Sequence, residues 1–292
     1  MSRPSFLIIG FGGYIASRHL SAIKDIDGVI KGVIDIEFDD RLLKDLPENI
    51  IKANNIEDFF KEYQNEIDFL VVCSPNFLHV EHIIKGLERN MNIISEKPLA
   101  LDVKGLESIR KAEDVSNGKV DGILQLRLHP VVAQLQELVK KLDKDNHEIN
   151  LVFVAKRDDV YFESWKGNLS LSGGILLNLG VHYFDLVLNI FGEFSDIFIE
   201  DHSIKRSKGY VKLKKGTVNW LFSFEQEDID SYVSENDSVH RSISVDGNEI
   251  EFSRVEEDLH TLSYKMILSG KGFSIKDASN SIDLIDKINQ IR

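Results

Sequence analysis

The sequence predicts an α/β fold, with a doubly wound parallel sheet in the N-terminal half and an α+β domain with an open, mainly antiparallel sheet in the C-terminal half. Three observations lead to this prediction. Short apolar runs alternate with amphipathic stretches through the first 125 residues, a glycine-rich turn directly follows the first run, and closely spaced strand patterns dominate the second half. We therefore expect a Rossmann domain over residues 1–125 and a sheet domain over residues 126–292.

The parallel strands of the first half are expected at five short apolar runs. Buried parallel strands show such continuous runs because helices cover both faces of their sheet. The expected strands are Phe6–Ile9, Gly32–Ile36, Phe69–Cys73, Asn92–Ser95 and Gly122–Leu126. Helical periodicity between them is clearest over His79–Arg89 and Val103–Ala112. The alternation is continuous enough to form one doubly wound domain.

After about Arg127 the pattern becomes that of a sheet-rich domain. Strands are expected at Glu148–Arg157, Ile197–Glu200, Gly209–Leu213, Val218–Phe224, Ile243–Val245 and Glu249–Phe252. Turn signals at Lys214–Gly216 and at Asp246-Gly247 join successive strands as hairpins. Consecutive hairpins make a mainly antiparallel sheet.

Two helices are expected beside this second sheet. Gly174–Phe191 has the pattern of a long amphipathic helix, and Asp277 could cap a closing helix that runs to Ile291. The acidic stretch Glu225–Asp237 is most simply a solvated loop.

Composition argues against several classes of partner. The formal net charge is −13 without a basic block, which argues against general affinity for nucleic acid or anionic membranes. Cys73 is the only cysteine, and no carboxylate cluster completes a metal site with His79 and His82, so we expect neither a disulfide nor a metal. The apolar run Phe6–Phe11 is too short for a signal sequence, and no later stretch approaches the roughly 18 apolar residues of a membrane span. We expect a cytoplasmic protein.

The turn after the first strand has the composition of a dinucleotide-binding loop. Glycines at positions 10, 12 and 13 precede a predicted helix, where they would let the backbone approach a pyrophosphate at the helix N-terminus. Ile15 stands where the third glycine of GxGxxG would be, and Ala16 is placed to make the close contact between helix and strand. Gly10, Gly12, Gly13, Tyr14 and Ile15 are therefore candidate cofactor-binding residues.

Asp35 strengthens this interpretation because it ends the second strand at a suitable distance from the turn. An acidic residue about 20 positions after the glycines accepts hydrogen bonds from the adenosine ribose hydroxyls. Its negative charge would repel a 2′-phosphate. The sequence therefore favours NAD over NADP as the cofactor.

Two later segments carry a more specific signal. Cys73-Ser74-Pro75-Asn76-Phe77-Leu78-His79 and Ser95-Glu96-Lys97-Pro98-Leu99 each end a predicted parallel strand, at the edge of the sheet where a cofactor binds. They resemble the (T/S)PNxxH and EKP signatures of the Gfo/Idh/MocA oxidoreductases. The resemblance continues through Gln125–Pro130 and Ser172–Asp185, so it covers essentially the whole chain.

Within that family the sequence is most similar to the UDP-N-acetylglucosaminuronate 3-dehydrogenases of bacterial surface-polysaccharide biosynthesis. The segments that carry this closer resemblance are Gly13–Ala16 with Arg18-His19, Ile123–Arg127, Ser164–Gly167, Asn178–His182, Arg241–Ile243 and Asp258–His260. Many family members have Asp at the position of Asn178, whereas this branch carries Asn. The resemblance implies NAD, a UDP-sugar substrate, a homotetramer and, in some members, 2-oxoglutarate as the oxidant that recycles the cofactor.

The chemistry of alcohol oxidation points to Lys97 and His182, which we expect to act where the two domains meet. A hydride acceptor must be accompanied by a group that removes the hydroxyl proton. Lys97 follows a strand beside the expected nicotinamide, where burial and the cofactor's charge would lower its pKa. His182 shares a helix face with Asn178 and Asp185. The sequence does not decide which residue is the base; we favour Lys97 with His182 as its partner.

The resemblance also implies further binding residues. Besides the glycine turn and Asp35, the cofactor contacts are expected from Ser74, Asn76, His79, Glu96, Lys97, Gln125 and Trp165. Substrate contacts are expected from Lys97, Arg157, Trp165, Lys166, Asn178 and His182. A weaker expectation is that Arg241 reaches the diphosphate, in a neighbouring subunit. The cations among them suit the carboxylate or phosphates of an anionic nucleotide sugar.

Three functions remain open at this stage. The leading one is oxidation of C3 of UDP-N-acetyl-D-glucosaminuronate. A second is NAD-dependent oxidation of another sugar or an inositol. A third is a cofactor-binding sensor without catalysis, against which the presence of both Lys97 and His182 argues.

Overall fold

The computed structural model describes residues 3–63, 65–142, 144–250 and 258–291, and it divides into two compact units. The first unit comprises Met1–Leu124 and Glu257–Ser279, and the second comprises Gln125–Glu256 and Asn280–Arg292. The first boundary lies one residue from the predicted division at 125/126. The return of Glu257–Ser279 to the first unit was not predicted, because the second domain was expected to be continuous.

The first unit is built on a seven-stranded sheet. Its strands are β1 (Ser5–Ile9), β2 (Val29–Ile34), β3 (Ile51–Ala53), β4 (Phe69–Val72), β5 (Asn92–Ser95), β6 (Val120–Gly122) and β13 (Phe273–Ser274). They lie in the order β13-β6-β5-β4-β1-β2-β3, and all pairs are parallel except β13 with β6. After β1 the chain adds β2 and β3 on one side of it, and it then adds β4, β5 and β6 on the other side. Ligands of such sheets bind at this switch point, at the carboxyl ends of the strands.

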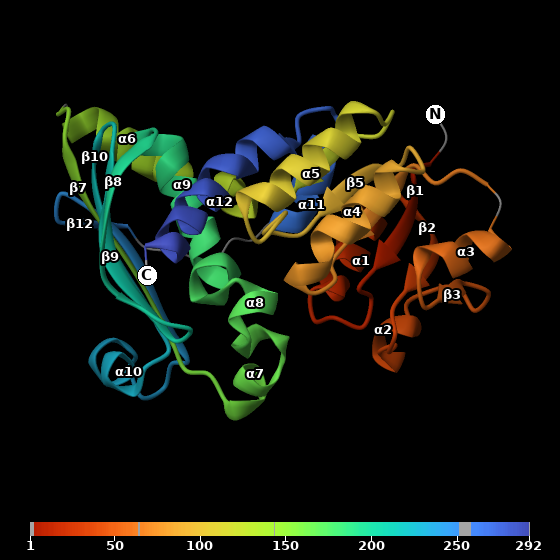
Figure 1. Cartoon of the computed structure of the whole chain (residues 1–292), viewed down its shortest axis with the longest axis horizontal. Helices are drawn as coiled ribbons and strands as arrows, with labels where there is room; N and C mark the ends of the chain where they lie inside the picture. The colour runs from red at the N-terminus through yellow and green to blue at the C-terminus, as the bar shows by residue number, and fades with distance from the viewer. Residues whose placement is uncertain (1–2, 64, 143, 251–257, 292) are drawn as a thin grey trace. The chain divides into compact units, whose positions relative to one another are not determined.

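The helices of the first unit are α1 (Ala16–Asp25), α2 (Asp40–Leu43), α3 (Ile56–Glu62), α4 (His79–Leu87), α5 (Val103–Asp114) and α11 (Leu259–Leu268), with a 3₁₀ turn η1 (Asn76–Leu78). Right-handed crossovers place α1 on one face of the sheet and α4 and α5, which lie side by side in Figure 1, on the other. Helix α11 packs against α1, and its Tyr264 and Ile267 join the buried core around Phe6 and Val71. This packing explains why the C-terminal segment returns to the first unit.

The second unit contains a six-stranded sheet. Its strands are β7 (His147–Ala155), β8 (Phe194–His202), β9 (Arg206–Leu213), β10 (Gly216–Ser223), β11 (Val239–Val245) and β12 (Asn248–Ile250), in the order β12-β11-β7-β10-β9-β8. Only β7 and β10 pair in parallel, so the prediction of a mainly antiparallel sheet is confirmed. Asp246 and Gly247 have φ angles of +51° and +80°, as the predicted tight hairpin turn requires. Residues 251 and 252 of the predicted last strand lie outside the described residues.

The helical elements of the second unit are η2 (Gln125–Leu128), α6 (Val131–Leu142), α7 (Asp159–Glu163), η3 (Trp165–Gly167), α8 (Leu169–Ser172), η4 (Leu176–Gly180), α9 (Val181–Phe191) and α10 (Gln226–Tyr232), and α12 (Ile275–Gln290) begins in the first unit and ends in the second. Helix α9 lies against the sheet, which is seen edge-on in Figure 1. Its Phe184 ring meets Trp220 and Phe222 of β10 edge-on, with centroids 5.4 and 5.6 Å apart. These aromatic contacts fix the helix that carries His182.

Three local predictions were wrong, and a fourth was right in part. The strand expected at Gly122–Leu126 ends at Gly122, because the chain there turns into η2. The acidic stretch expected as a loop contains α10. Gly174–Phe191 is helical throughout, as predicted, but it includes a π-helical turn and is buried on nearly all sides, so it is not amphipathic. Asp277 lies inside the first turn of α12, where its carboxylate accepts a hydrogen bond from Ser274 N.

The segment Leu169–Phe191 has the length and hydropathy of a membrane-spanning helix, with a mean hydropathy of 1.5. The expectation that no stretch approaches that limit was therefore wrong on composition. Because 78% of the window is buried within the protein, the segment forms part of the core.

Candidate active site

The glycine turn between β1 and α1 brings the backbone close to its neighbours in a way that excludes side chains. Gly10 has a φ of +92°, and a Cβ there would lie 2.2 Å from Ser74 N. A Cβ on Gly12 would lie 2.3 Å from Glu37 O. The side chain of Ile15, at the N-cap of α1, makes no capping hydrogen bond. The N–H groups of Gly10, Gly12 and Gly13 donate to Ile34 O, Asp35 Oδ2 and Gly10 O. An anion at this turn would therefore meet the N–H groups of Tyr14 and Ile15, which make no hydrogen bond within the described residues.

Asp35, which directly follows β2, is held at this turn by three backbone groups. Its Oδ2 accepts a hydrogen bond from Gly12 N at 2.8 Å, and its Oδ1 accepts from Ile36 N and Glu37 N at 2.7 and 3.2 Å. The structure thus joins the predicted acidic residue to the predicted glycines. Tyr14 is 84% exposed beside them, so its ring is accessible to a ligand.

The signature segments after β4 and β5 meet because those strands are neighbours, with Val72 opposite Ser95. His79 connects the two segments: its Nδ1 lies 2.6 Å from Pro98 O, and its Nε2 lies 2.7 Å from Ser74 O. The ring is 1% exposed. His79 thereby fixes the two segments that carry the predicted cofactor residues Ser74, Asn76, Glu96 and Lys97.

Two features of the environment of His79 have opposite effects on its charge. Both carbonyl oxygens only accept hydrogen bonds, so the protonated ring would satisfy both, whereas the neutral ring has one N–H. Burial lowers the pKa of His79, and the carbonyl contacts oppose that effect. His82, whose Nδ1 lies 2.9 Å from Ser74 Oγ, has a pKa lowered to about 4, mainly by burial.

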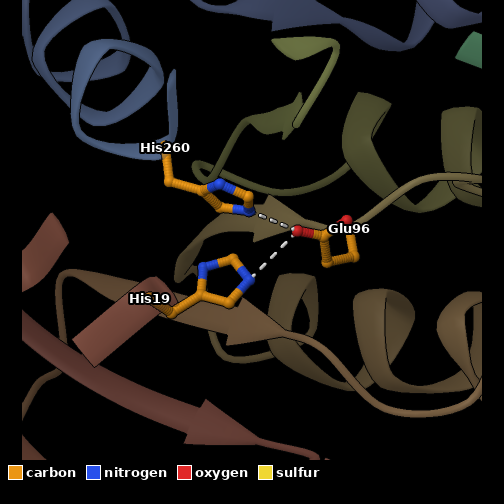
Figure 2. Close-up of side chains that lie close together, drawn as sticks. All are labelled: His19, Glu96 and His260. Atoms are coloured by element: carbon orange, nitrogen blue, oxygen red, sulfur yellow. Dashed lines mark hydrogen bonds and ion pairs between the residues drawn. The ribbon is translucent and has the colours of Figure 1, made fainter. Parts of the chain in front are cut away.

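Glu96 does not point its whole carboxylate at the predicted cofactor site. Its Oε1 lies 2.9 Å from His260 Nε2 and 3.3 Å from His19 Nε2, as Figure 2 shows, and its Oε2 accepts a hydrogen bond from Lys97 N at 3.3 Å. All three clustered residues are at least nine-tenths buried. Burial raises the pKa of Glu96, but hydrogen bonds from the two histidines outweigh it and hold that pKa well below its usual range. The carboxylate is therefore ionised.

The two histidines of this cluster were not among the predicted site residues. They belong to Arg18-His19 and Asp258–His260, segments that carried the closer family resemblance without an assigned role. Their donor atoms and that of Glu96 lie within 4.8 Å of one another, so the group has the dimensions of a metal site, although the sequence predicted no metal. Residues 19, 96 and 260 are too far apart in the sequence for their spacing to indicate a cluster. They come together because α11 packs within the first unit.

In the second unit, Tyr161 is the centre of a cationic and aromatic cluster. Its ring has the Arg157 guanidinium carbon 5.3 Å and Lys166 Nζ 5.7 Å from its centroid, and its hydroxyl accepts a hydrogen bond from Asn178 Nδ2 at 3.4 Å. The structure thus gathers three predicted substrate residues around one residue that sequence reasoning missed. We call this group the Tyr161 cluster (Arg157, Tyr161, Lys166 and Asn178).

Local sequence explains how these side chains are placed. Asp158 caps α7 through Tyr161 N, and Ser164 caps the following 3₁₀ turn through Lys166 N. A Cβ on Gly167 would lie 1.9 Å from Phe162 O, so this tight turn requires glycine. The short α7 and η3 therefore present Tyr161, Trp165 and Lys166 from two consecutive capped turns.

Burial and the nearby positive charge of Arg157 lower the pKa of Lys166. Two cations held around one aromatic ring repel each other, and an anion placed between them would relieve that repulsion. The cluster is therefore suited to a carboxylate or a phosphate. Its aromatic faces suit the apolar side of a sugar ring.

His182 follows Asn178 by one turn and lies on α9, where it is half-buried. Asp185, on the same helix, is 3% exposed and accepts two hydrogen bonds at 2.8 Å from Arg127 of η2. The predicted shared face is thus divided: Asp185 anchors the helix, whereas Asn178 belongs to the Tyr161 cluster. A catalytic role for His182 stays a prediction, as does that of Lys97 in the first unit.

The remaining predicted residues lie elsewhere in the second unit. Trp165 lies next to the cluster, with its ring 5.8 Å from Lys166 Nζ. Gln125 lies in η2, and its side-chain oxygen is buried without a hydrogen bond from the described residues. Arg241 is exposed on β11 and makes no hydrogen bond or ion pair within the described part of the chain. Of these predicted residues, the structure places Trp165 next to the Tyr161 cluster, whereas Arg241 is not among the residues that form it.

Comparison with known protein families gives two matches. Residues 5–121 match a family model described as an oxidoreductase family with an NAD-binding Rossmann fold, and residues 147–198 match the C-terminal α/β domain of the same Gfo/Idh/MocA family. Among solved structures, the WlbA (WbpB) dehydrogenase of Thermus thermophilus in complex with NAD and alpha-ketoglutarate is 31% identical. It has a TM-score of 0.91, covering 99% of this chain and 96% of that one. A second structure of that dehydrogenase contains NAD and UDP-GlcNAcA and has a TM-score of 0.90, covering 98% of this chain and 94% of that one.

Curated relatives match over shorter lengths. An oxidoreductase of Bacillus subtilis (strain 168), YteT, is 29% identical over 136 residues, which cover 45% of this chain and 32% of that protein. The glucose-6-phosphate 3-dehydrogenase of the same organism is 26% identical over 223 residues, which cover 71% of this chain and 59% of that protein. The match thus spans about a third of YteT.

Proposed function

The chain belongs to the Gfo/Idh/MocA oxidoreductase family, and we propose that it is an NAD-dependent dehydrogenase that oxidises the C3 hydroxyl of UDP-N-acetyl-D-glucosaminuronate to a ketone. The observation that carries this proposal is the Tyr161 cluster, which holds two cations and an amide around an aromatic ring. Similarity to a dehydrogenase crystallised with UDP-GlcNAcA supports the choice of substrate.

The geometry of the glycine turn fits NAD. A Cβ on Gly10 or Gly12 would collide with the backbone of Ser74 or Glu37, so glycine lets the turn lie against the strand ends where we propose that the pyrophosphate binds. The Asp35 carboxylate, fixed to Gly12 N, would accept hydrogen bonds from the adenosine ribose and repel a 2′-phosphate. Bound NAD⁺ supplies the hydride acceptor for the reaction.

In the proposed reaction, Lys97 removes the hydroxyl proton of the substrate and His182 acts as its partner. Positioned proton transfer contributes about 10²–10⁴-fold to such reactions. Arg157 and Lys166 bind the uronate carboxylate or a phosphate through charge-assisted hydrogen bonds, and Asn178 orients a sugar oxygen. Trp165 packs on the sugar or the nicotinamide, and Arg241 contacts the diphosphate. Ser74, Asn76, His79, Glu96 and Gln125 are proposed to contact or shape the cofactor site.

The resemblance supports three further proposals. We infer that 2-oxoglutarate regenerates NAD⁺, since the Thermus protein was crystallised with NAD and alpha-ketoglutarate. We also propose that the protein is a cytoplasmic homotetramer. The 3-keto nucleotide sugar would then serve O-antigen biosynthesis as the substrate of an aminotransferase.

Incubation of the purified protein with NAD⁺, 2-oxoglutarate and UDP-N-acetyl-D-glucosaminuronate tests the proposal. We expect mass spectrometry to detect a nucleotide sugar lighter by two hydrogen atoms. The matched control is neutral UDP-N-acetylglucosamine, and the charge-reversal variant Arg157→Glu should raise KM for the uronate more than for this neutral sugar. Absence of the oxidised product from a protein that binds NAD would contradict the substrate assignment.

A second candidate is oxidation of C3 in a sugar phosphate without a nucleotide. The Bacillus subtilis relative named glucose-6-phosphate 3-dehydrogenase favours it, because a phosphate would also satisfy Arg157 and Lys166. Turnover of glucose 6-phosphate under the same conditions, without turnover of the UDP-sugar, would select this function. Binding of NAD without turnover of either sugar would instead favour a sensor.

A further inference from the structure

The His19–Glu96–His260 cluster has no assigned role, although it lies directly beside the proposed base. Glu96 precedes Lys97 in the chain and accepts a hydrogen bond from its backbone N–H at 3.3 Å. The histidines come from α1, which follows the glycine turn, and from α11 (Figure 2). The cluster therefore connects the dinucleotide helix and the returning C-terminal helix to the strand end that carries Lys97.

Hydrogen bonds engage most polar atoms of the cluster, and the exception is His19 Nε2, for which the described residues offer only the 3.3 Å ion-pair contact with Glu96 Oε1. His260 Nε2 donates to Glu96 Oε1 at 2.9 Å, and Glu96 N donates to Val72 O at 2.8 Å. Burial lowers the pKa of His19, so the ring is neutral. A neutral ring can accept from the Tyr264 hydroxyl at Nδ1, 2.8 Å away, and present Nε2–H towards Glu96 at 3.3 Å.

A metal ion suits this arrangement less well. Structural zinc takes four ligands, whereas the group of described residues supplies three. Coordination would also require both Nε2 atoms to lose their protons, and the 2.9 Å contact between His260 and Glu96 is already that of a direct hydrogen bond.

We propose that the His19–Glu96–His260 cluster is a positioning element that keeps the Glu96 carboxylate from pairing with the side-chain ammonium group of Lys97. This inference rests on the proposed role of Lys97 as the base. Both carboxylate oxygens are engaged, one by the two imidazoles and the other by the Lys97 backbone N–H. Loss of His260 would release the carboxylate to approach the neighbouring ammonium group.

A Glu96 carboxylate released from His260 would act on the charged and titratable groups around it. Besides the two histidines, Asp258 and Tyr264 face the cluster from the segment that includes α11, and Cys73 and His79 face it from the β4 side. Lys97 is the next residue along the chain, and its charge acts on His79. Burial raises the pKa of Cys73 and of Tyr264, so both stay neutral. The freed negative charge would therefore act mainly on Lys97.

An opposite charge within about 4–6 Å favours the ammonium form and raises a lysine pKa by about 1–3 units. In His260→Leu we therefore expect the pKa of Lys97 to rise by at least one unit. The neutral fraction at a fixed pH then falls about tenfold per unit, and the acid limb of the pH–rate profile moves to higher pH by the same amount. The amide of the glutamine in His260→Gln can still donate a hydrogen bond to Glu96. In this variant we expect the neutral fraction of Lys97 at a fixed pH, and the rate on the acid limb, to be within about threefold of their values in the unmodified protein.

The experiment uses the full chain with bound NAD⁺. Lysines are labelled by reductive ¹³C-methylation, the Lys97 signal is assigned with Lys97→Arg, and its titration is followed by NMR without any sugar. Ser263→Ala, which alters another buried residue of α11 whose hydroxyl donates to Leu259 O, is the matched control and should leave the Lys97 titration unchanged. If the unmodified protein turns over no sugar, the proposed function fails, yet this titration still decides the role of the cluster.

Three results would overturn the proposal. The first is an unchanged Lys97 titration in His260→Leu. The second is a raised pKa of Lys97 that persists when Glu96→Gln is added to His260→Leu, since the pairing carboxylate is then absent; this double variant also serves if its parent folds poorly. The third is one equivalent of a transition metal, found by elemental analysis in the purified protein and lost in His19→Gln, which would make the cluster a metal site.

Discussion

Asp35 illustrates how one side chain can decide the choice of cofactor. Its two oxygens accept hydrogen bonds from the backbone N–H groups of Gly12, Ile36 and Glu37, which fix the carboxylate at the glycine turn. A carboxylate in this place attracts ribose hydroxyls and repels a 2′-phosphate. We therefore propose that specificity for NAD depends on a charge that the backbone holds in one position.

Replacing Asp35 with Ala should weaken NAD binding by about 10–100-fold, because a hydrogen bond to a charged group contributes roughly 1.5–3 kcal/mol. It should also reduce discrimination against NADP. Fluorescence titration with NADH and NADPH measures both effects. Asp39→Asn, at the nearby cap of α2, is the control. An unchanged preference for NAD would mean that another residue reads the ribose.

At the scale of elements, the buried pair between Arg127 and Asp185 connects η2 to α9. Both side chains are largely buried, at 12% and 4% exposed, and their two hydrogen bonds are 2.8 Å long. Such a pair contributes mainly by avoiding an unpaired buried charge. It therefore fixes the helix that carries His182.

Asp185→Ala should lower the free energy of unfolding by about 3–5 kcal/mol, because it removes the carboxylate that accepts two hydrogen bonds from the largely buried Arg127 guanidinium. Urea unfolding followed by circular dichroism measures this change. Lys212→Ala, which removes an exposed ion pair with Asp196 on the second sheet, is the control and should cost much less. Equal losses in the two variants would contradict a structural role for the buried pair.

For the molecule as a whole, the sequence predicted both sheets, because apolar periodicity reports which residues are buried. It did not predict α10, since an acidic surface helix has too few apolar positions to distinguish it from a loop. Nor could it place α11 on α1, because that packing depends on contacts between residues more than 200 positions apart, such as Thr261 with Asp25.

The residues of the candidate site, like the elements of the fold, could be predicted only in part. Lys97 and Lys166 could be proposed from the sequence because each lies in a segment that carries the family resemblance, and the structure places Lys166 beside Tyr161. Tyr161 was missed although Asp158 marks the start of its helix, because one aromatic residue in a short helix gives no signal of its own. The histidines at 19 and 260 were missed because only the tertiary fold brings them to Glu96.

The central claim is that this dehydrogenase uses Lys97 to oxidise an anionic nucleotide sugar with NAD⁺. The most direct test compares the unmodified protein with Lys97→Ala in a single turnover, recording reduced nicotinamide after mixing with UDP-N-acetyl-D-glucosaminuronate, alongside NAD affinity by calorimetry. We predict that the variant loses at least about 10²-fold in rate while its affinity for NAD stays within a few fold. Full activity in Lys97→Ala would contradict the account.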